Sequence, residues 1–149
     1  MKLKIPPPVY MLIFATFMWL LSQHYPLYKF LFNSQHLGVG IILLGLTIDL
    51  ISLIKFLRSK TSINPMKPEN SQILVTTGMY KFSRNPMYLG LLLLLTGWSL
   101  YMGAVSAMLL LPLFAWVLTK MQIQPEEIIL EKLFGQPYVE YKKKVHRWI

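Results

Sequence analysis

The feature that most restricts the fold of this chain is a long stretch without a charged side chain. The 35 residues 85–119 include no Asp, Glu, Lys or Arg. A helix or hairpin in water needs a polar face along its length, and this stretch cannot supply one. Only 14% of the 149 residues are charged, against about 25% in ordinary soluble domains. The sequence therefore predicts an integral membrane protein.

This charge-free stretch is too long for a single crossing. As one helix, its 35 residues would extend about 52 Å, whereas the hydrocarbon core of a bilayer is about 30 Å thick. We therefore expect a helical hairpin with arms 86–101 and 104–119 and a turn at 101–104. Each arm is about 24 Å long, which is short for a full crossing and implies local thinning or shielding by other helices.

Two further apolar segments precede the hairpin. Segment 6–22 begins with three prolines, which are tolerated in the first turn of a helix. Segment 37–57 contains a single acid, Asp49. The polar segment 58–85 is rich in Pro, Asn, Ser and Thr and is expected to be an irregular loop. The predicted fold is one all-α membrane domain, 1–149, with about four transmembrane helices and no Rossmann domain, because no G-x-G-x-x-G motif occurs in a strand–helix context.

The distribution of basic residues predicts the orientation. In a four-span topology, fourteen of the fifteen Lys and Arg residues fall on one side, and only Lys29 falls on the other. By the positive-inside rule, that side is cytoplasmic and holds both termini, loop 58–85 and tail 120–149. The net charge of +9 then faces anionic headgroups of membrane lipid, and nucleic acid is not expected as a partner. No pattern indicates an oligomeric state.

The tail, 120–149, is too polar to cross a membrane. Pro125 followed by two acids predicts a helix start, Gly135 predicts a stop, and a second helix follows. On that second helix Tyr138 and Tyr141 share a face flanked by lysines. This pattern predicts an amphipathic interfacial helix that lies on anionic lipid.

Three cytoplasmic places carry more polar residues than an anchor needs. Segment 76–90 combines a turn glycine, the cation Arg84 and the amide Asn85 at the start of a span, where backbone N–H groups could hold an anion. The pair 126–127 is acidic and could bind a cationic group or ribose hydroxyls. Arg147 lies near the end of the tail. Each also fits a plainer role: a helix cap with interfacial Arg and Tyr, complementation of a helix dipole, or a snorkelling cation. No Cys or His cluster predicts a metal site.

Two spaced motifs resemble the isoprenylcysteine carboxyl methyltransferase and phospholipid methyltransferase superfamily. The first is Gly78-x-Tyr80-x-x-x-Arg84-Asn85-Pro86-x-Tyr88-x-Gly90, and the second is Glu126-Glu127-x-x-Leu130-x-x-x-Phe134-Gly135-x-x-Tyr138-x-x-Tyr141-x-x-x-Val145-x-Arg147. The resemblance covers residues 63–149 and implies S-adenosylmethionine bound between the loop before the hairpin and the tail. It implies eight cofactor-binding residues: Tyr80, Arg84, Asn85, Pro86, Tyr88, Gly90, Glu126 and Glu127. It also implies Arg84, Glu127 and Arg147 as catalytic residues, with the arginines steering an anionic acceptor. Asn85 stands where many members have His, and His146 where many have Pro.

The function implied by this resemblance is methyl transfer to a lipophilic acceptor that enters from the bilayer. Transfer from a sulfonium mainly requires alignment and exclusion of water. A carboxylate acceptor is already ionised at neutral pH and needs no general base, which favours it over an alcohol. A prenylated carboxylate, a phospholipid amine and a small thiol or other hydrophobic acid all remain candidates. Two other functions fit the residues: a small proton-coupled transporter using Asp49, the one acid inside a predicted span, and a non-catalytic membrane subunit.

Overall fold

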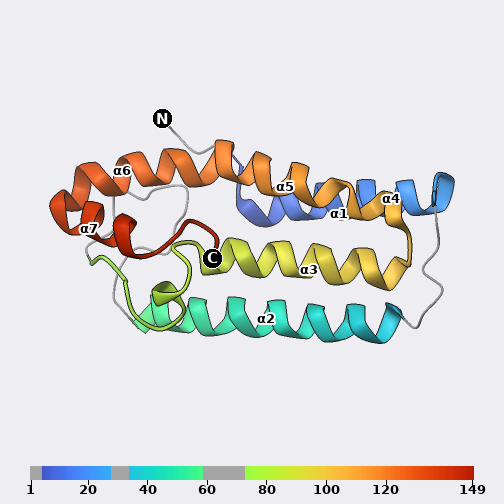
Figure 1. Ribbon diagram of the computed structural model, residues 1–149, viewed down its shortest axis with the longest axis horizontal. Coiled ribbons are helices and arrows are strands. Elements are labelled where there is room, and N and C mark those ends of the chain that lie inside the picture. The colour runs from blue at the N-terminus through green and yellow to red at the C-terminus, as the bar shows by residue number, and fades with distance from the viewer. Residues whose placement is uncertain (1–4, 28–33, 59–72) are drawn as a thin grey trace.

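The computed structural model describes residues 5–27, 34–58 and 73–149, and its regular secondary structure in those ranges is helical (Figure 1). The elements are α1 (Pro7–His24), α2 (Ser34–Arg58), a 3-10 turn η2 (Gly78–Lys81), α3 (Pro86–Met102), α4 (Val105–Met108), α5 (Leu110–Leu118), a π-helical turn η3 (Thr119–Ile123), α6 (Gln124–Phe134) and α7 (Gln136–Lys144). The long helices run side by side along the longest axis of the molecule. The predicted all-α fold is thus confirmed, although half of loop 58–85 lies outside the described residues.

The first three long helices lie where the sequence predicts apolar spans. Helices α1, α2 and α3 match the predicted segments 6–22, 37–57 and 86–101 to within three residues at each end. The predicted turn at 101–104 is also confirmed. Gly103 adopts a left-handed conformation with φ of 69°, and its N–H donates to the carbonyls of Ser99 and Leu100 at 3.1 Å. Glycine suits this position because a side chain would strain the backbone.

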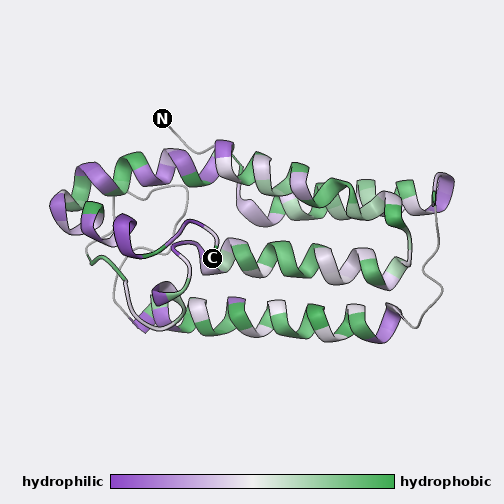
Figure 2. Cartoon of the chain, in the orientation of Figure 1, coloured by the Kyte–Doolittle hydropathy of each residue, from purple (hydrophilic) through white to green (hydrophobic). Residues whose placement is uncertain are grey.

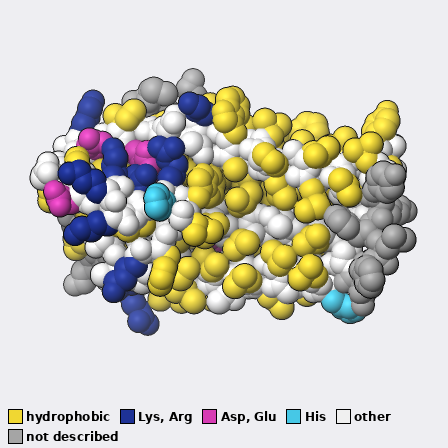
Figure 3. Space-filling view, viewed as in Figure 1, with side chains coloured by type: hydrophobic (Ala, Val, Ile, Leu, Met, Phe, Trp, Pro, Cys, Tyr) yellow, Lys and Arg dark blue, Asp and Glu magenta, His cyan; other side chains and the backbone are white. Residues whose placement is uncertain are grey.

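Two helical runs, Ser34–Arg58 and Val105–Phe134, are long and apolar enough to cross a membrane by length and composition. Helix α3 is also apolar but shorter. Large apolar side chains also lie on the outside of the bundle, including Leu12 and Leu43, which are 60% and 58% exposed. Figures 2 and 3 show apolar residues along most of the bundle and charged residues gathered at the end that holds α6 and α7. We call this the charged end.

Close contact between α2 and α3 forms one side of the bundle. A Cβ on Gly97 would lie 2.5 Å from the carbonyl oxygen of Gly38, and a Cβ on Gly38 would lie 2.6 Å from that of Gly97. Small residues allow two helix backbones to approach in this way. On the other side of α3, Met18, Leu95 and Phe114 are buried in a core shared by α1, α3 and α5. Helix α3 is therefore held from both sides.

The second arm of the hairpin differs from the prediction. Pro125 lies in the first turn of α6, as predicted, but helical structure continues from Val105 to Phe134, so the expected break before α6 is absent. Pro125 lacks an N–H, and the π-helical turn before it shifts the hydrogen bonding: Gln124 N–H donates to the carbonyl of Thr119, five residues earlier. This shift lets the helix continue through the proline. A break at Leu109 lies just before Pro112, whose ring crowds the carbonyl four residues earlier.

Helix α7 folds back against α6 at the charged end. Gly135 separates the two helices with φ of 59°, which confirms the predicted stop. The aromatic face of α7 is buried in the protein, since Tyr138 and Tyr141 are only 3% and 8% exposed. The prediction that this face lies on lipid was therefore wrong. Periodicity identified an apolar face, but it could not distinguish lipid from protein as its neighbour.

Candidate functional site

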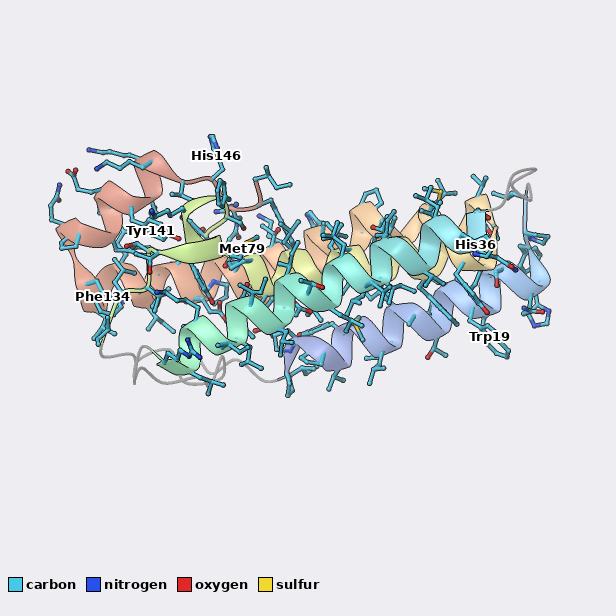
Figure 4. All side chains as sticks on the ribbon, turned by 90° about the horizontal axis from the view of Figure 1, so that it is seen from below. Trp19, His36, Met79, Phe134, Tyr141 and His146 are labelled. Atoms are coloured by element: carbon cyan, nitrogen blue, oxygen red, sulfur yellow. The ribbon has the colours of Figure 1, made fainter. Side chains whose placement is uncertain are left out.

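A cavity of about 680 Å³ lies at the charged end, between α2, α3, α6 and α7. Its size is typical of small-molecule sites, which occupy about 300–1,000 Å³. Much of its wall is aliphatic or aromatic, from residues such as Leu46, Leu53 and Phe56. Figure 4 shows Phe134 and Tyr141 at this end of the molecule and Trp19 at the opposite end. The polar and phenolic groups in the wall are Asp49, Tyr80, Arg84, Asn85, Tyr88, Glu126, Glu127, Tyr138 and Tyr141.

Seven of the eight residues predicted to bind the cofactor line this cavity. They are Tyr80, Arg84, Asn85, Pro86, Tyr88, Glu126 and Glu127. They come from the loop before α3, the first turn of α3, and α6. Gly90 and Arg147 are not in the wall. Pro86 is the first residue of α3, where its missing N–H costs nothing, so it fixes the point at which the loop becomes helix.

Among the three predicted catalytic residues, Glu127 contacts both of the others. Its Oε1 lies 2.9 Å from Arg84 Nη1, and its two oxygens accept from Arg147 Nε and Nη2 at 3.0 and 2.7 Å. The side chains of Arg84 and Glu127 are only 10% and 11% exposed, whereas that of Arg147 is 33% exposed. The hydrogen bond to Glu127 raises the pKa of Arg147 above its ordinary value. Two guanidiniums therefore share one buried carboxylate, which leaves the trio with a net charge of +1.

The C-terminal segment is attached to the loop before α3 by its backbone. Arg84 N–H donates to the carbonyl of His146 at 3.0 Å, and Asn85 Nδ2 donates to the carbonyl of Arg147 at 2.9 Å. Ser83 Oγ approaches the same carbonyl at 3.4 Å. Asn85 thus uses its amide as a donor that holds the chain end. This docking keeps the guanidinium of Arg147 at Glu127.

Two phenol hydroxyls make hydrogen bonds around the cavity. Tyr88 Oη donates to Glu126 Oε1 at 2.5 Å, and Tyr141 Oη donates to the carbonyl of Tyr80 at 2.6 Å. Burial raises the pKa of Tyr141 to about 12 and raises the pKa of Tyr80 further. Tyr80 and Tyr141 therefore remain protonated at neutral pH, where their hydroxyls can donate hydrogen bonds but cannot act as bases.

Asp49 was not predicted to belong to this site. It lies in the cavity wall, and its carboxylate occupies the space that a side chain at Gly90 would fill. A Cβ on Gly90 would be 1.8 Å from Asp49 Oδ1. Gly90 therefore serves the site by admitting Asp49 rather than by lining the cavity. The sequence places these residues about forty positions apart, and no local pattern pairs them.

Four residues of α6 and α7 that the sequence analysis left out of the site also line the cavity. They are Leu130, Phe134, Tyr138 and Tyr141. All four belong to the second motif, so their spacing was a usable signal. Among the described residues, no group of three or more His, Cys, Asp and Glu side chains is placed to hold a metal ion.

Comparison with known proteins links the site to a family. Residues 34–137 match the family model described as phospholipid methyltransferase. The protein-S-isoprenylcysteine O-methyltransferase of Schizosaccharomyces pombe is 30% identical over 120 residues, which cover 80% of this chain and 51% of that protein. The enzyme of the same name from Saccharomyces cerevisiae is 31% identical over 109 residues, 73% of this chain and 46% of that protein. The chain spans about half the length of these curated relatives. An uncharacterized protein of Haemophilus influenzae is 46% identical over 63 residues, 42% of this chain and all of that protein.

Proposed function

Since the chain belongs to the phospholipid methyltransferase family, as its two motifs predict, we propose that it transfers a methyl group from S-adenosylmethionine to a lipophilic acceptor. One observation carries the proposal: seven of the eight residues that the motifs imply for the cofactor line a single cavity. They come from segments separated by more than thirty residues. A purely structural anchor has no need to gather these side chains around an open volume.

The groups in the wall suit the parts of S-adenosylmethionine. Arg84 Nε is buried and has no hydrogen-bond partner among the described residues, so it can bind the carboxylate of the methionine moiety. Glu126 can accept hydrogen bonds from an ammonium group or from ribose hydroxyls. Phe134 and Tyr138 provide aromatic surfaces on which an adenine can stack. The cavity therefore combines an anion site, a cation site and an aromatic wall.

The chain would act mainly by alignment. The bound cofactor supplies a methyl group that is already activated by its sulfonium. A carboxylate acceptor is ionised at neutral pH, because its reference pKa is near 4, and it needs no base. Arg147, which is fixed by Glu127 and does not line the cavity, would hold that carboxylate at the cavity edge. We therefore propose an isoprenylcysteine carboxyl methyltransferase-like reaction, in which a methyl ester is formed.

We further propose four membrane spans, formed by α1, α2, α3 and α4–α5, with both termini and the charged end in the cytoplasm. The clustering of charged side chains at that end supports this topology (Figure 3). The cavity then lies at the membrane–cytoplasm boundary. Leu46 and Leu50 line the cavity although they are 50% and 58% exposed on α2. The wall is therefore continuous with the lipid-facing surface, which supports sideways entry of a lipophilic acceptor.

Calorimetric binding of S-adenosylmethionine to detergent-purified protein tests the cofactor. We expect Arg84→Gln to weaken binding by about tenfold or more, because it removes a charged hydrogen bond. Lys142→Gln is the matched control, since Lys142 pairs with Glu131 on the surface and does not line the cavity. It should bind like the wild type. Absence of binding by wild-type protein with a cooperative thermal transition would refute the proposed function.

A methylation assay tests the acceptor. Wild-type protein in lipid vesicles is supplied with S-adenosylmethionine carrying a labelled methyl group and either a prenylated cysteine or its carboxamide. A methyl ester releases methanol in alkali, so volatile label is expected from the acid alone. Labelling of the amide at the same rate, or of water-soluble carboxylates only, would contradict a lipophilic carboxylate acceptor.

A further inference from the structure

Asp49 is an acid that neither motif accounts for. It lies on α2 in the cavity wall, and its Oδ1 is buried without a hydrogen-bond partner among the described residues. Its surroundings on α2 are apolar, with Leu46, Leu50 and Leu53 lining the same cavity. Burying a carboxylate among such residues is costly unless a partner compensates it. The structure nevertheless makes room for it, because α3 carries a glycine where any side chain would clash with its carboxylate.

The described basic residues of the site do not compensate this carboxylate. Arg84 and Arg147 both pair with Glu127. The other polar groups near Asp49 are acids or phenols: Tyr80, whose pKa is raised by burial and further by Tyr141, Glu126 and Asp49, and Tyr88, which donates to Glu126. Two carboxylic acids outside the arginine cluster, Asp49 and Glu126, therefore line the cavity, whereas the loop and the chain end carry the guanidiniums.

We propose that Asp49 is a binding residue for the positively charged sulfonium of the methyl donor. The inference rests on the proposed function. A cation between Asp49 and Glu126 would neutralise the unpaired carboxylate, and the faces of Tyr80 and Tyr88 would add cation–π attraction. Arg84, which also lines the cavity, takes the donor's carboxylate. The acids of the cavity would thus face the cationic part of the ligand, and the guanidinium would face its carboxylate.

This arrangement has a consequence for turnover. Loss of the methyl group converts the sulfonium into a neutral thioether, so the product S-adenosylhomocysteine has no positive charge at sulfur for Asp49 to bind. Asp49 therefore favours the donor over the product and helps the product leave. A mutation that changes the ratio of the donor and product affinities indicates a binding role for Asp49. A folding defect would instead weaken the binding of both ligands by the same factor.

The test compares three ligands by calorimetry on detergent-purified full-length protein. They are S-adenosylmethionine, an analogue with a protonated amine in place of the sulfonium, and S-adenosylhomocysteine. We expect wild type to bind both cations more tightly than the neutral product. Asp49→Asn keeps the side-chain size. It should weaken the binding of both cations by about tenfold to a hundredfold and change the affinity for the product by less than about twofold. Glu140→Gln removes an acid that does not line the cavity and should change none of the three.

Each outcome decides one question. If wild type binds all three ligands equally, or if Asp49→Asn weakens all three by the same factor or none of them, the inference is overturned while the proposed function stands. If well-folded wild type binds none of the three, the proposed function itself fails, and the inference fails with it. The wild-type comparison remains decisive even if Asp49→Asn does not fold.

Discussion

Replacing Glu127 with glutamine removes the negative charge that two arginines share while keeping the size of the side chain. Arg84 and Glu127 are each about nine-tenths buried. Loss of one partner of a buried ion pair costs about 3–5 kcal/mol, because the other charge is left uncompensated. Arg147 is one-third exposed, and water can solvate it, so we take the lower end, about 3 kcal/mol. At about 2–4 °C per kcal/mol for a chain of this length, the midpoint of thermal unfolding should fall by about 6–12 °C.

Glu131→Gln provides a matched control on the same helix. Glu131 Oε2 lies 2.7 Å from Lys142 Nζ, so this pair is as short as the Glu127 pairs. Its side chains are 44% and 32% exposed, and exposed ion pairs contribute about 0–1 kcal/mol. The midpoint should therefore fall by less than about 4 °C. The two sites have similar pair distances, and they differ in burial and in their partners, which are two arginines for Glu127 and one lysine for Glu131.

Thermal unfolding of both variants in the same detergent, followed by tryptophan fluorescence, measures the difference. Raising the salt concentration should erase the small effect of Glu131→Gln, because salt screens exposed charges more than buried ones. The effect of Glu127→Gln should persist. Equal shifts for the two variants, or a negligible shift for Glu127→Gln, would refute the argument that the buried carboxylate holds the loop, α6 and the chain end together.

Three further substitutions test other parts of the site. Gly90→Ala places a Cβ 1.8 Å from Asp49 Oδ1 and should destabilise the protein by about 1–3 kcal/mol while weakening donor binding in calorimetry; Gly40→Ala, with open space around it, should do neither. Gly135→Ala also meets no neighbour, but its φ of 59° should cost about 1–3 kcal/mol in thermal or denaturant unfolding. Tyr88→Phe removes a hydroxyl that donates to a buried acid of α6, and its unfolding free energy should fall by about 1.5–3 kcal/mol.

The helices were predictable because local signals mark them. Hydropathy located α1, α2 and α3, proline at the first position marked the start of α3, and Gly103 marked its end. The continuation through Pro125 was not predictable from the same signals, since proline followed by acids is typical of a helix start. Packing decided it: Gln122 and Ile123, just before the proline, are almost completely buried, which holds this segment helical.

The residues that form the site were predictable only where they belong to one of the two motifs. The resemblance supplied the residues of the loop and of α6, and the structure brings them to one cavity. Asp49 could not be assigned, because its relation to Gly90 depends on how α2 packs on α3. An acid in an apolar helix fits a transporter, a helix contact or a ligand site equally well from sequence alone. Only the position of the cavity distinguishes these cases.

The spacing within the second motif follows from the geometry of the helical turn at the charged end. From Glu127, α6 continues for about two helical turns to Gly135, and α7 then returns over a similar length before Arg147. Equal lengths out and back bring Arg147 beside Glu127, twenty residues earlier. The same return lays Tyr138 and Tyr141 over the cavity. Deleting one residue from α7 would rotate everything after it by about 100°, so the motif specifies helix lengths as much as chemical groups.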